Sequence, residues 1–169
     1  MEENEEIMEE NEATMEENEI IIERSETIRE ENIDINVRAK DWEDAVQLSG
    51  ELLVKSNYIT QEYIDITIDC IKEIGPYIVI APGLAISHSV PDENVLKTGV
   101  SLITLSEPID FGSPNDPVEI VITLAAEDDS THIDELKILV EIFSEEIMIE
   151  NIKECKTAKE IADIINGEL

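Results

Sequence analysis

Three runs of β-forming residues in the middle of the chain constrain its fold more than any other feature. They are YIVIA at residues 77–81, TGVSLITL at 98–105 and PVEIVITLAA at 117–126. Two of them are almost continuously apolar, which is typical of strands covered on both faces. We therefore expect a central sheet with helices packed on either side.

Two helices are predicted ahead of these runs. Apolar residues recur at helical spacing from Trp42 to Leu53, and Asp41 is a candidate N-cap. The segment after Thr60 fits both an alternating strand and a helical pattern. Its length of about 14 residues, ended by Gly75 and a proline, favours the helix.

Two more helices are predicted after the last run. Helical spacing returns from Ile133 to Phe143, and a capping box at Thr157 starts a final helix that stops at Gly167. The order is helix, helix, strand, loop, strand, strand, helix, helix. This order predicts an α/β fold, a three-layer sandwich with a central mixed sheet flanked by helices.

An acidic repeat opens the chain: MEENEEI, MEENEAT, MEENEII. A period of seven suggests a coiled coil. However, its apolar residues are adjacent to one another, and asparagine occupies the second of the two positions that should be apolar in each heptad. Residues 1–36 hold 15 acidic and two basic residues. We predict an acidic low-complexity extension over 1–36, disordered or partly helical, and one folded domain over 37–169. A partner-binding helix within the extension is the alternative.

The net charge of −31 excludes several functions. A surface this acidic repels nucleic acids and anionic lipids, so neither is an expected partner. No apolar run approaches the length of about 20 residues that a membrane span needs, and the N-terminus is acidic, so we expect a cytoplasmic protein without a signal peptide or membrane insertion. Cys70 and Cys155 lack any zinc-ligand spacing and are expected to be thiols.

The sequence lacks the common signatures of nucleotide, zinc, calcium and serine-nucleophile sites. No metal or cofactor is therefore expected, and the two histidines become the candidates for chemistry. A neutral imidazole nitrogen is available as a nucleophile at cellular pH without strong activation.

His88 follows the first β-forming run in the stretch IVIAPGLAISHSVPDE. We expect it in a loop bracketed by Pro82-Gly83 and Pro91, at the end of a strand, where α/β proteins often carry their sites. The alternative is a loop histidine with only a hydrogen-bonding role.

His132 follows the last β-forming run. If Thr131 is an N-cap, His132 lies in the first turn of a helix beside free N–H groups, a location that suits a bound phosphate. The alternative is a histidine that simply tolerates a first-turn position. Together, a histidine in a strand-end loop and one at a helix start are able to converge at one edge of the sheet.

The residues around both histidines resemble a known family. The stretch GPYIVIAPGLAISHSVPDENVLKTGVSLITLSEPIDFG, followed by DPVEIVITLAAEDDSTHIDELKIL, is similar to the enzyme IIA domain of the bacterial phosphotransferase system. The resemblance is to the mannitol/fructose superfamily, nearest its ascorbate-type branch, and runs from about Trp42 to Ile165. It implies an α/β sandwich with a mixed sheet.

The resemblance also implies a function. His88 would be phosphorylated by the phosphohistidine of the carrier protein HPr and would pass the phosphoryl group to an enzyme IIB component, which serves a membrane IIC permease. His132 would help to hold the phosphoryl group. The expected pathway substrate is ascorbate or a related sugar acid or pentitol. Such a transfer needs in-line positioning and hydrogen-bond donors but no cofactor.

One residue departs from the family pattern. Ser87 precedes the active histidine where the family usually has proline, so the loop gains an N–H and loses a fixed φ. Two alternatives to a transport function stay open. One is a regulatory module that binds a transcription factor or another protein according to its phosphorylation state, and the other is a catalytically silent binding protein.

Overall fold

The structure is a computed structural model, and it describes residues 26–167. At its centre is a sheet with the strand order β1-β4-β5-β3-β2. The strands are β1 (Ile33–Val37), β2 (Val79–Ala81), β3 (Leu84–Ser87), β4 (Gly99–Ile109) and β5 (Val118–Ala125). β1 is parallel to β4 and β3 is parallel to β5, whereas the β4–β5 and β2–β3 pairs are antiparallel. The sheet is mixed, as the sequence predicts.

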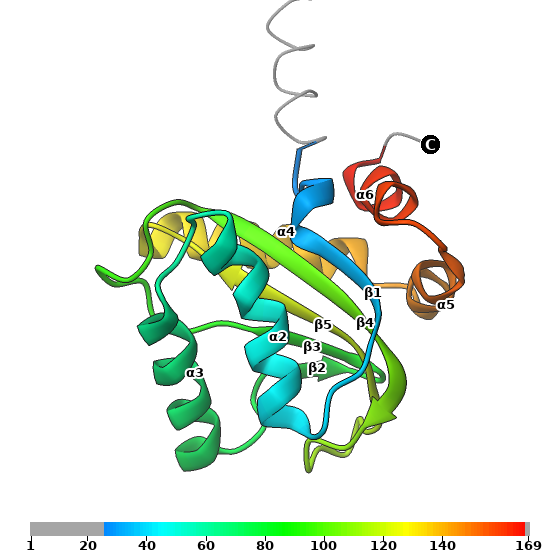
Figure 1. The fold of residues 1–169 in the computed structure, drawn as a ribbon, viewed down its shortest axis with the longest axis horizontal. Helices are drawn as coiled ribbons and strands as arrows, with labels where there is room; N and C mark the ends of the chain where they lie inside the picture. Colours follow the sequence, from blue (N-terminus) through cyan, green and yellow to red (C-terminus); the bar gives the residue numbers. More distant parts are fainter. Residues whose placement is uncertain (1–25, 168–169) are drawn as a thin grey trace, which may run out of the picture.

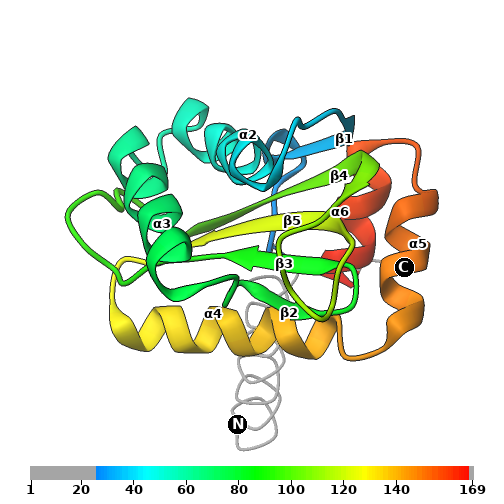
Figure 2. The ribbon, with the colours of Figure 1, turned by 90° about the horizontal axis from the view of Figure 1, so that it is seen from below.

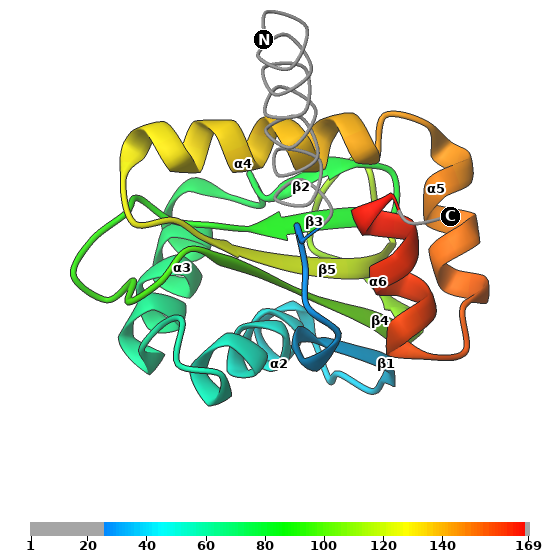
Figure 3. The same cartoon turned by 90° about the horizontal axis from the view of Figure 1, so that it is seen from above.

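Helices cover both faces of this sheet (Figures 1 and 2). One face packs against α2 (Trp42–Lys55) and α3 (Gln61–Ile74), and the other against α4 (Asp129–Ile142), α5 (Glu146–Glu154) and α6 (Ala158–Asn166). Figure 3 shows α4 on the opposite side of the sheet from α2 and α3. The buried residues form two clusters, one on each face. The predicted three-layer α/β sandwich is confirmed.

The helix ends that the sequence predicts are mostly observed. The Asp41 side chain accepts a hydrogen bond from the Asp44 amide at 2.9 Å, and the Thr157 side chain accepts one from the Glu160 amide at 3.2 Å. The ambiguous segment after Thr60 is the helix α3, and it ends at Gly75, whose φ of +110° few other residues adopt.

The folded chain begins earlier than predicted. Residues 33–37 were expected to lie mainly in the acidic extension, but they form β1 at the edge of the sheet, preceded by a 3-10 helix, η1 (Glu30–Asn32). Ile28 is also buried, and its backbone exchanges two hydrogen bonds with the Asn166 side chain in α6. The expected boundary after residue 36 is therefore wrong for residues 26–36. The rest of the predicted extension, residues 1–25, lies outside the described residues.

Two further elements escaped the sequence prediction. The run at 77–81 ends in a hairpin, because Gly83 has a φ of +83° and the chain returns as β3, whose four residues are all buried. The short helix α5 follows α4 after a turn. In the described part of the chain, no helix has the length and apolar character needed to cross a membrane.

Candidate functional site

The sheet brings the two histidines to one edge. β3 and β5 run parallel and in register, with Ser87 opposite Thr123, so both strands end at the same edge of the sheet. His88 is the first residue after β3, and His132 lies in α4, the helix that follows β5. Their ring centroids are 5.4 Å apart, with the rings tilted by 50°. The structure thus places both predicted site residues together.

The start of α4 differs from the sequence prediction. Asp128, not Thr131, is the N-cap, and its side chain accepts a hydrogen bond from the Thr131 amide at 2.7 Å, which lowers the pKa of Asp128. The His132 amide donates to the Asp128 carbonyl at 2.9 Å. The helix begins earlier because a carboxylate caps better than a threonine hydroxyl. As a result, the amides of residues 131 and 132 are already bonded and are not free to bind an anion.

One hydrogen bond fixes the tautomer of His88. Its Nδ1 lies 2.7 Å from the carbonyl oxygen of Ile86. A carbonyl oxygen only accepts, so Nδ1 carries a proton and donates it, and in the neutral ring Nε2 keeps a free electron pair. Burial lowers the pKa of His88 below its ordinary value of 6.5; the bond to Ile86 opposes this shift and the His132 ring adds to it. The His88 ring is therefore neutral at cellular pH, with a free electron pair on Nε2.

Tyr77 contacts both the ring and the backbone of His88, and no role for it was predicted from the sequence. Its ring meets the His88 ring edge-on, with centroids 5.4 Å apart and an interplanar angle of 89°. Its hydroxyl donates a hydrogen bond of 2.6 Å to the backbone oxygen of His88. Burial raises the pKa of Tyr77 to about 12, so the hydroxyl stays protonated. The only signal in the sequence was the position of Tyr77 in the quoted GPY motif.

The histidines lie in a pocket of about 530 Å³ between α3, the loop after β3 and α4. Its lining residues are Cys70, Ile74, Tyr77, His88, Ser89, Val90, Pro91, Asp129, His132 and Ile133. Three of them form an apolar rim that is open to solvent: Ile74 is 72% exposed, Val90 74% and Ile133 51%. Exposed apolar residues gathered in this way are typical of a surface that a protein partner covers.

Few charged side chains line the pocket. Among residues 26–167, no lysine or arginine lines it, and Asp129 is the one acidic residue in its wall. The Nδ1 atom of His132 is buried and has no hydrogen-bond partner within the described chain. Buried polar atoms without a partner are uncommon, and an oxygen of a bound group is one way to satisfy this one.

Ser87 does not lie in a loose loop. It is the last residue of β3, is buried, and pairs in register with Thr123 of β5. Strand pairing therefore holds the backbone up to the residue before His88, without the restraint that a proline gives.

Comparisons with known proteins assign this chain to a family. Residues 26–168, which include β1, match the family described as "Phosphoenolpyruvate-dependent sugar phosphotransferase system, EIIA 2". A relative from Salmonella typhimurium, named "Ascorbate-specific PTS system EIIA component", is 41% identical over 138 residues, covering 80% of this chain and 89% of the relative.

Two solved structures with the same fold come from Escherichia coli. The mannitol-specific cryptic phosphotransferase enzyme IIA CmtB has a TM-score of 0.77 at 35% identity, covering 85% of this chain and 98% of its own. Enzyme IIA for mannitol, in complex with phosphorylated enzyme IIB for mannitol, has a TM-score of 0.72 at 28% identity, covering 81% and 95%. The chain described here therefore belongs to the EIIA family of the phosphoenolpyruvate-dependent sugar phosphotransferase system.

Proposed function

We propose that this chain is a phosphoryl carrier in which His88 accepts a phosphoryl group from the phosphohistidine of HPr and passes it to an enzyme IIB component. The observation that carries this proposal is the hydrogen bond from His88 Nδ1 to the Ile86 carbonyl at 2.7 Å. It leaves Nε2 as the one ring nitrogen of His88 that is able to form a bond to phosphorus.

The transfer is a displacement at phosphorus between two imidazoles. The bond from His88 Nε2 to phosphorus forms as the bond from phosphorus to the donor's ring nitrogen breaks, and Nδ1 keeps its proton on the Ile86 carbonyl. Catalysis of this kind comes mainly from positioning and from donors for the charge on the phosphoryl oxygens. In the transfer to IIB, the bond from His88 Nε2 to phosphorus breaks as a bond from phosphorus to an acceptor atom of IIB forms.

His132 is proposed to stabilise the phosphoryl group. Its ring centroid lies 5.4 Å from that of His88, close enough for a phosphoryl group on His88 to meet it. Its buried Nδ1 has no partner among the described residues, and a phosphoryl oxygen would supply one. No lysine or arginine lines the pocket among the described residues, so the His132 imidazole is the donor that we propose for the phosphoryl oxygens.

The partners and the pathway follow from the relatives. We propose ascorbate, or a related sugar acid or pentitol, as the substrate, because the curated relatives at about 40% identity are named ascorbate-specific. A IIB partner is supported by the IIA–IIB complex of the mannitol enzymes, and a membrane IIC permease would act after IIB. The proposed compartment is the cytoplasm, in agreement with Cys70 and Cys155 being free thiols.

The test is a phosphorylation assay. The purified chain is incubated with phosphoenolpyruvate, enzyme I and HPr, and an acid-labile phosphohistidine is measured. We expect full labelling of the wild type, none of His88→Ala, and slower but complete labelling of His132→Ala. Labelling of His88→Ala as strong as that of the wild type sinks the assignment of His88, provided that circular dichroism shows both proteins folded.

A second measurement tests the acceptor. The labelled protein is mixed with a purified IIB protein of the ascorbate type and, as a control, with one of the mannitol type. We expect transfer to the ascorbate-type IIB to be faster. Equal rates would contradict the proposed substrate class, and a labelled protein that transfers to neither would contradict the carrier function itself.

A further inference from the structure

We propose that Tyr63 and Tyr77 are a pair of positioning residues that hold the peptide unit between His88 and Ser89 and thereby orient the His88 imidazole. This inference rests on the proposed function of His88. It concerns residues outside the two histidines, and it predicts that two hydroxyl groups set the rate of phosphoryl transfer without contacting the phosphoryl group.

The carbonyl end of this peptide unit is held by Tyr77. The Tyr77 hydroxyl donates to the His88 oxygen at 2.6 Å, a short and therefore strong hydrogen bond. The same residue packs edge-on against the His88 ring. Tyr77 therefore restrains both the backbone and the side chain of the nucleophile.

The amide end of the same peptide unit is held by Tyr63. The Ser89 amide donates to the Tyr63 hydroxyl oxygen at 3.0 Å, and this hydroxyl donates in turn to the backbone oxygen of Leu124 at 2.9 Å. Tyr63 is only 1% exposed. Its hydroxyl thus connects the residue after His88 to β5, the strand that leads to His132.

The two tyrosines lie near opposite ends of α3. Tyr63 lies in the first turn of α3, and Tyr77 follows the Gly75 that ends this helix. The two contacts fix the peptide plane, because one acts on its oxygen and the other on its N–H. A peptide held at only one end is still free to rotate about the bonds that flank it.

The orientation of this plane matters for the ring. The Nδ1 contact with Ile86 spans only two residues, so it requires one particular combination of backbone and side-chain angles at His88. Without the two hydroxyls, this peptide unit is no longer anchored and His88 is free to shift away from the Ile86 carbonyl. The Nδ1–H then loses its acceptor, and the ring populates the other tautomer, in which Nε2 carries the proton and is not nucleophilic. The two hydroxyls therefore preserve the nucleophilic form of His88.

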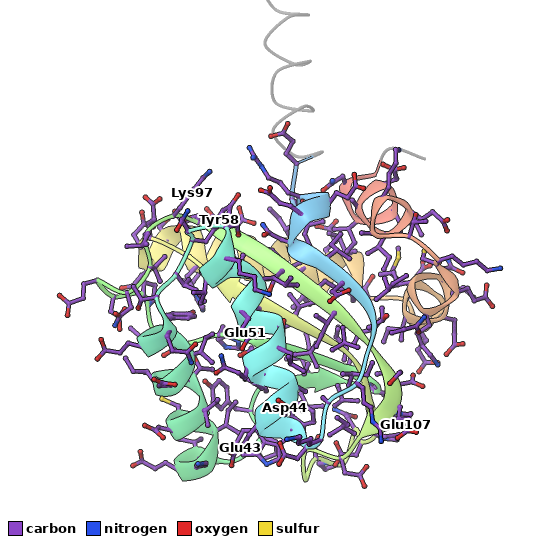
Figure 4. The ribbon with its side chains drawn as sticks, viewed as in Figure 1. Glu43, Asp44, Glu51, Tyr58, Lys97 and Glu107 are labelled. Atoms are coloured by element: carbon purple, nitrogen blue, oxygen red, sulfur yellow. The ribbon has the colours of Figure 1, made fainter. Side chains whose placement is uncertain are left out.

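The experiment compares Tyr63→Phe, Tyr77→Phe and the double variant with the wild type. The matched control is Tyr58→Phe, because Tyr58 is the third tyrosine of the chain, is also buried, and lies beneath Lys97 outside the pocket (Figure 4). The first readout is ¹⁵N NMR of the His88 ring in the unphosphorylated protein. The second is the rate of phosphoryl acceptance from HPr at saturating and at low donor concentrations.

We expect the wild type and Tyr58→Phe to show His88 with its proton on Nδ1. Each site variant is expected to show a mixture of tautomers and a saturated transfer rate about fivefold lower, the value of one neutral hydrogen bond, with the KM for HPr unchanged. The double variant is expected to be slower than either single one. The tautomer signal separates positioning from a merely structural role. A variant that only loses stability would keep the proton of His88 on Nδ1.

Two outcomes overturn the inference. One is an unchanged tautomer and rate in both single variants and in the double variant. The other is a loss of rate that comes only with a raised KM, which would assign the tyrosines to docking. If the wild type itself is not phosphorylated, the proposed function fails, whereas the NMR comparison still decides whether the tyrosines orient the ring. If Tyr63→Phe does not fold, the half-buried Tyr77 gives the same comparison alone.

Discussion

The imidazole of His88 lies against that of His132, with ring centroids 5.4 Å apart, although the two residues come from different elements. Burial is the main reason why the pKa of His88 is low, and the His132 ring lowers it further. We expect His132→Ala to raise the pKa of His88 toward its ordinary value, as measured by NMR titration of the His88 ring. An unchanged pKa would mean that the two rings are not electrostatically coupled.

The stability of the folded chain should also depend on His88. At a pH well above 6.5, its ring is neutral in both the folded and the unfolded chain and does not make the free energy of unfolding depend on pH. As the pH falls below 6.5, the unfolded chain binds a proton at this residue before the folded chain does, because the pKa of His88 is lowered by folding. The free energy of unfolding therefore decreases over this range, until the pH is below the folded pKa.

The measurement is urea unfolding of the wild type and of His88→Gln, at about pH 7.5 and about pH 5.5. Many carboxylates also titrate with pH, so the quantity of interest is the difference between the two proteins. We expect the wild type to lose more stability than His88→Gln on acidification. Parallel losses would contradict the lowered pKa.

The apolar rim of the pocket is expected to bind the protein partners. Ile133 is 51% exposed beside His132, and an aspartate there would place a charge in the contact. We expect Ile133→Asp to raise the KM for HPr about tenfold with little change in the saturated rate. The matched control is Ile147→Asp, since Ile147 is 58% exposed in α5, away from the pocket. Equal effects of both variants would argue against the rim.

The attachment of the N-terminal segment to α6 gives a stability prediction. The Asn166 side chain accepts from the Ile28 amide at 3.0 Å and donates to the Ile28 oxygen at 2.9 Å, and Ile28 is buried. Asn166→Ala should lower the free energy of unfolding by about 1–3 kcal/mol, because two backbone groups lose their partner. Urea unfolding measures this, with Lys159→Ala as a control, because that variant removes a largely exposed ion pair with Asp163 in the same helix. Equal midpoints for the two variants would contradict it.

The parts of the fold that could be predicted are those with local signals. α2 and α3 have capping residues and end signals, and β4 and β5 are long apolar runs. β1 was missed although Ile33, Ile35 and Val37 alternate, because the acidic composition around it outweighed a five-residue pattern. Its place is set by pairing with β4, which the local sequence does not encode.

The site could be predicted in its residues but not in its geometry. Both histidines were identified, yet the capping of α4 was misplaced, since Thr131 is an acceptable N-cap and the stronger cap, Asp128, lies only three residues before it. The contacts of Tyr63 and Tyr77 with the segment after β3 connect residues that are distant in sequence. Such contacts have no periodicity or motif that sequence reasoning is able to detect.

The parallel pairing of β3 and β5 has a consequence for how this site tolerates change. Ser87 lies opposite Thr123. His88 follows β3 directly, and His132 lies in the first turn of the helix that follows β5. A single inserted or deleted residue in either strand would shift one chain by about 3.3 Å and turn its side chains to the other face of the sheet. The register between β3 and β5 thus sets the distance between the two imidazoles. A change in length within either strand would move the histidines apart without altering either residue.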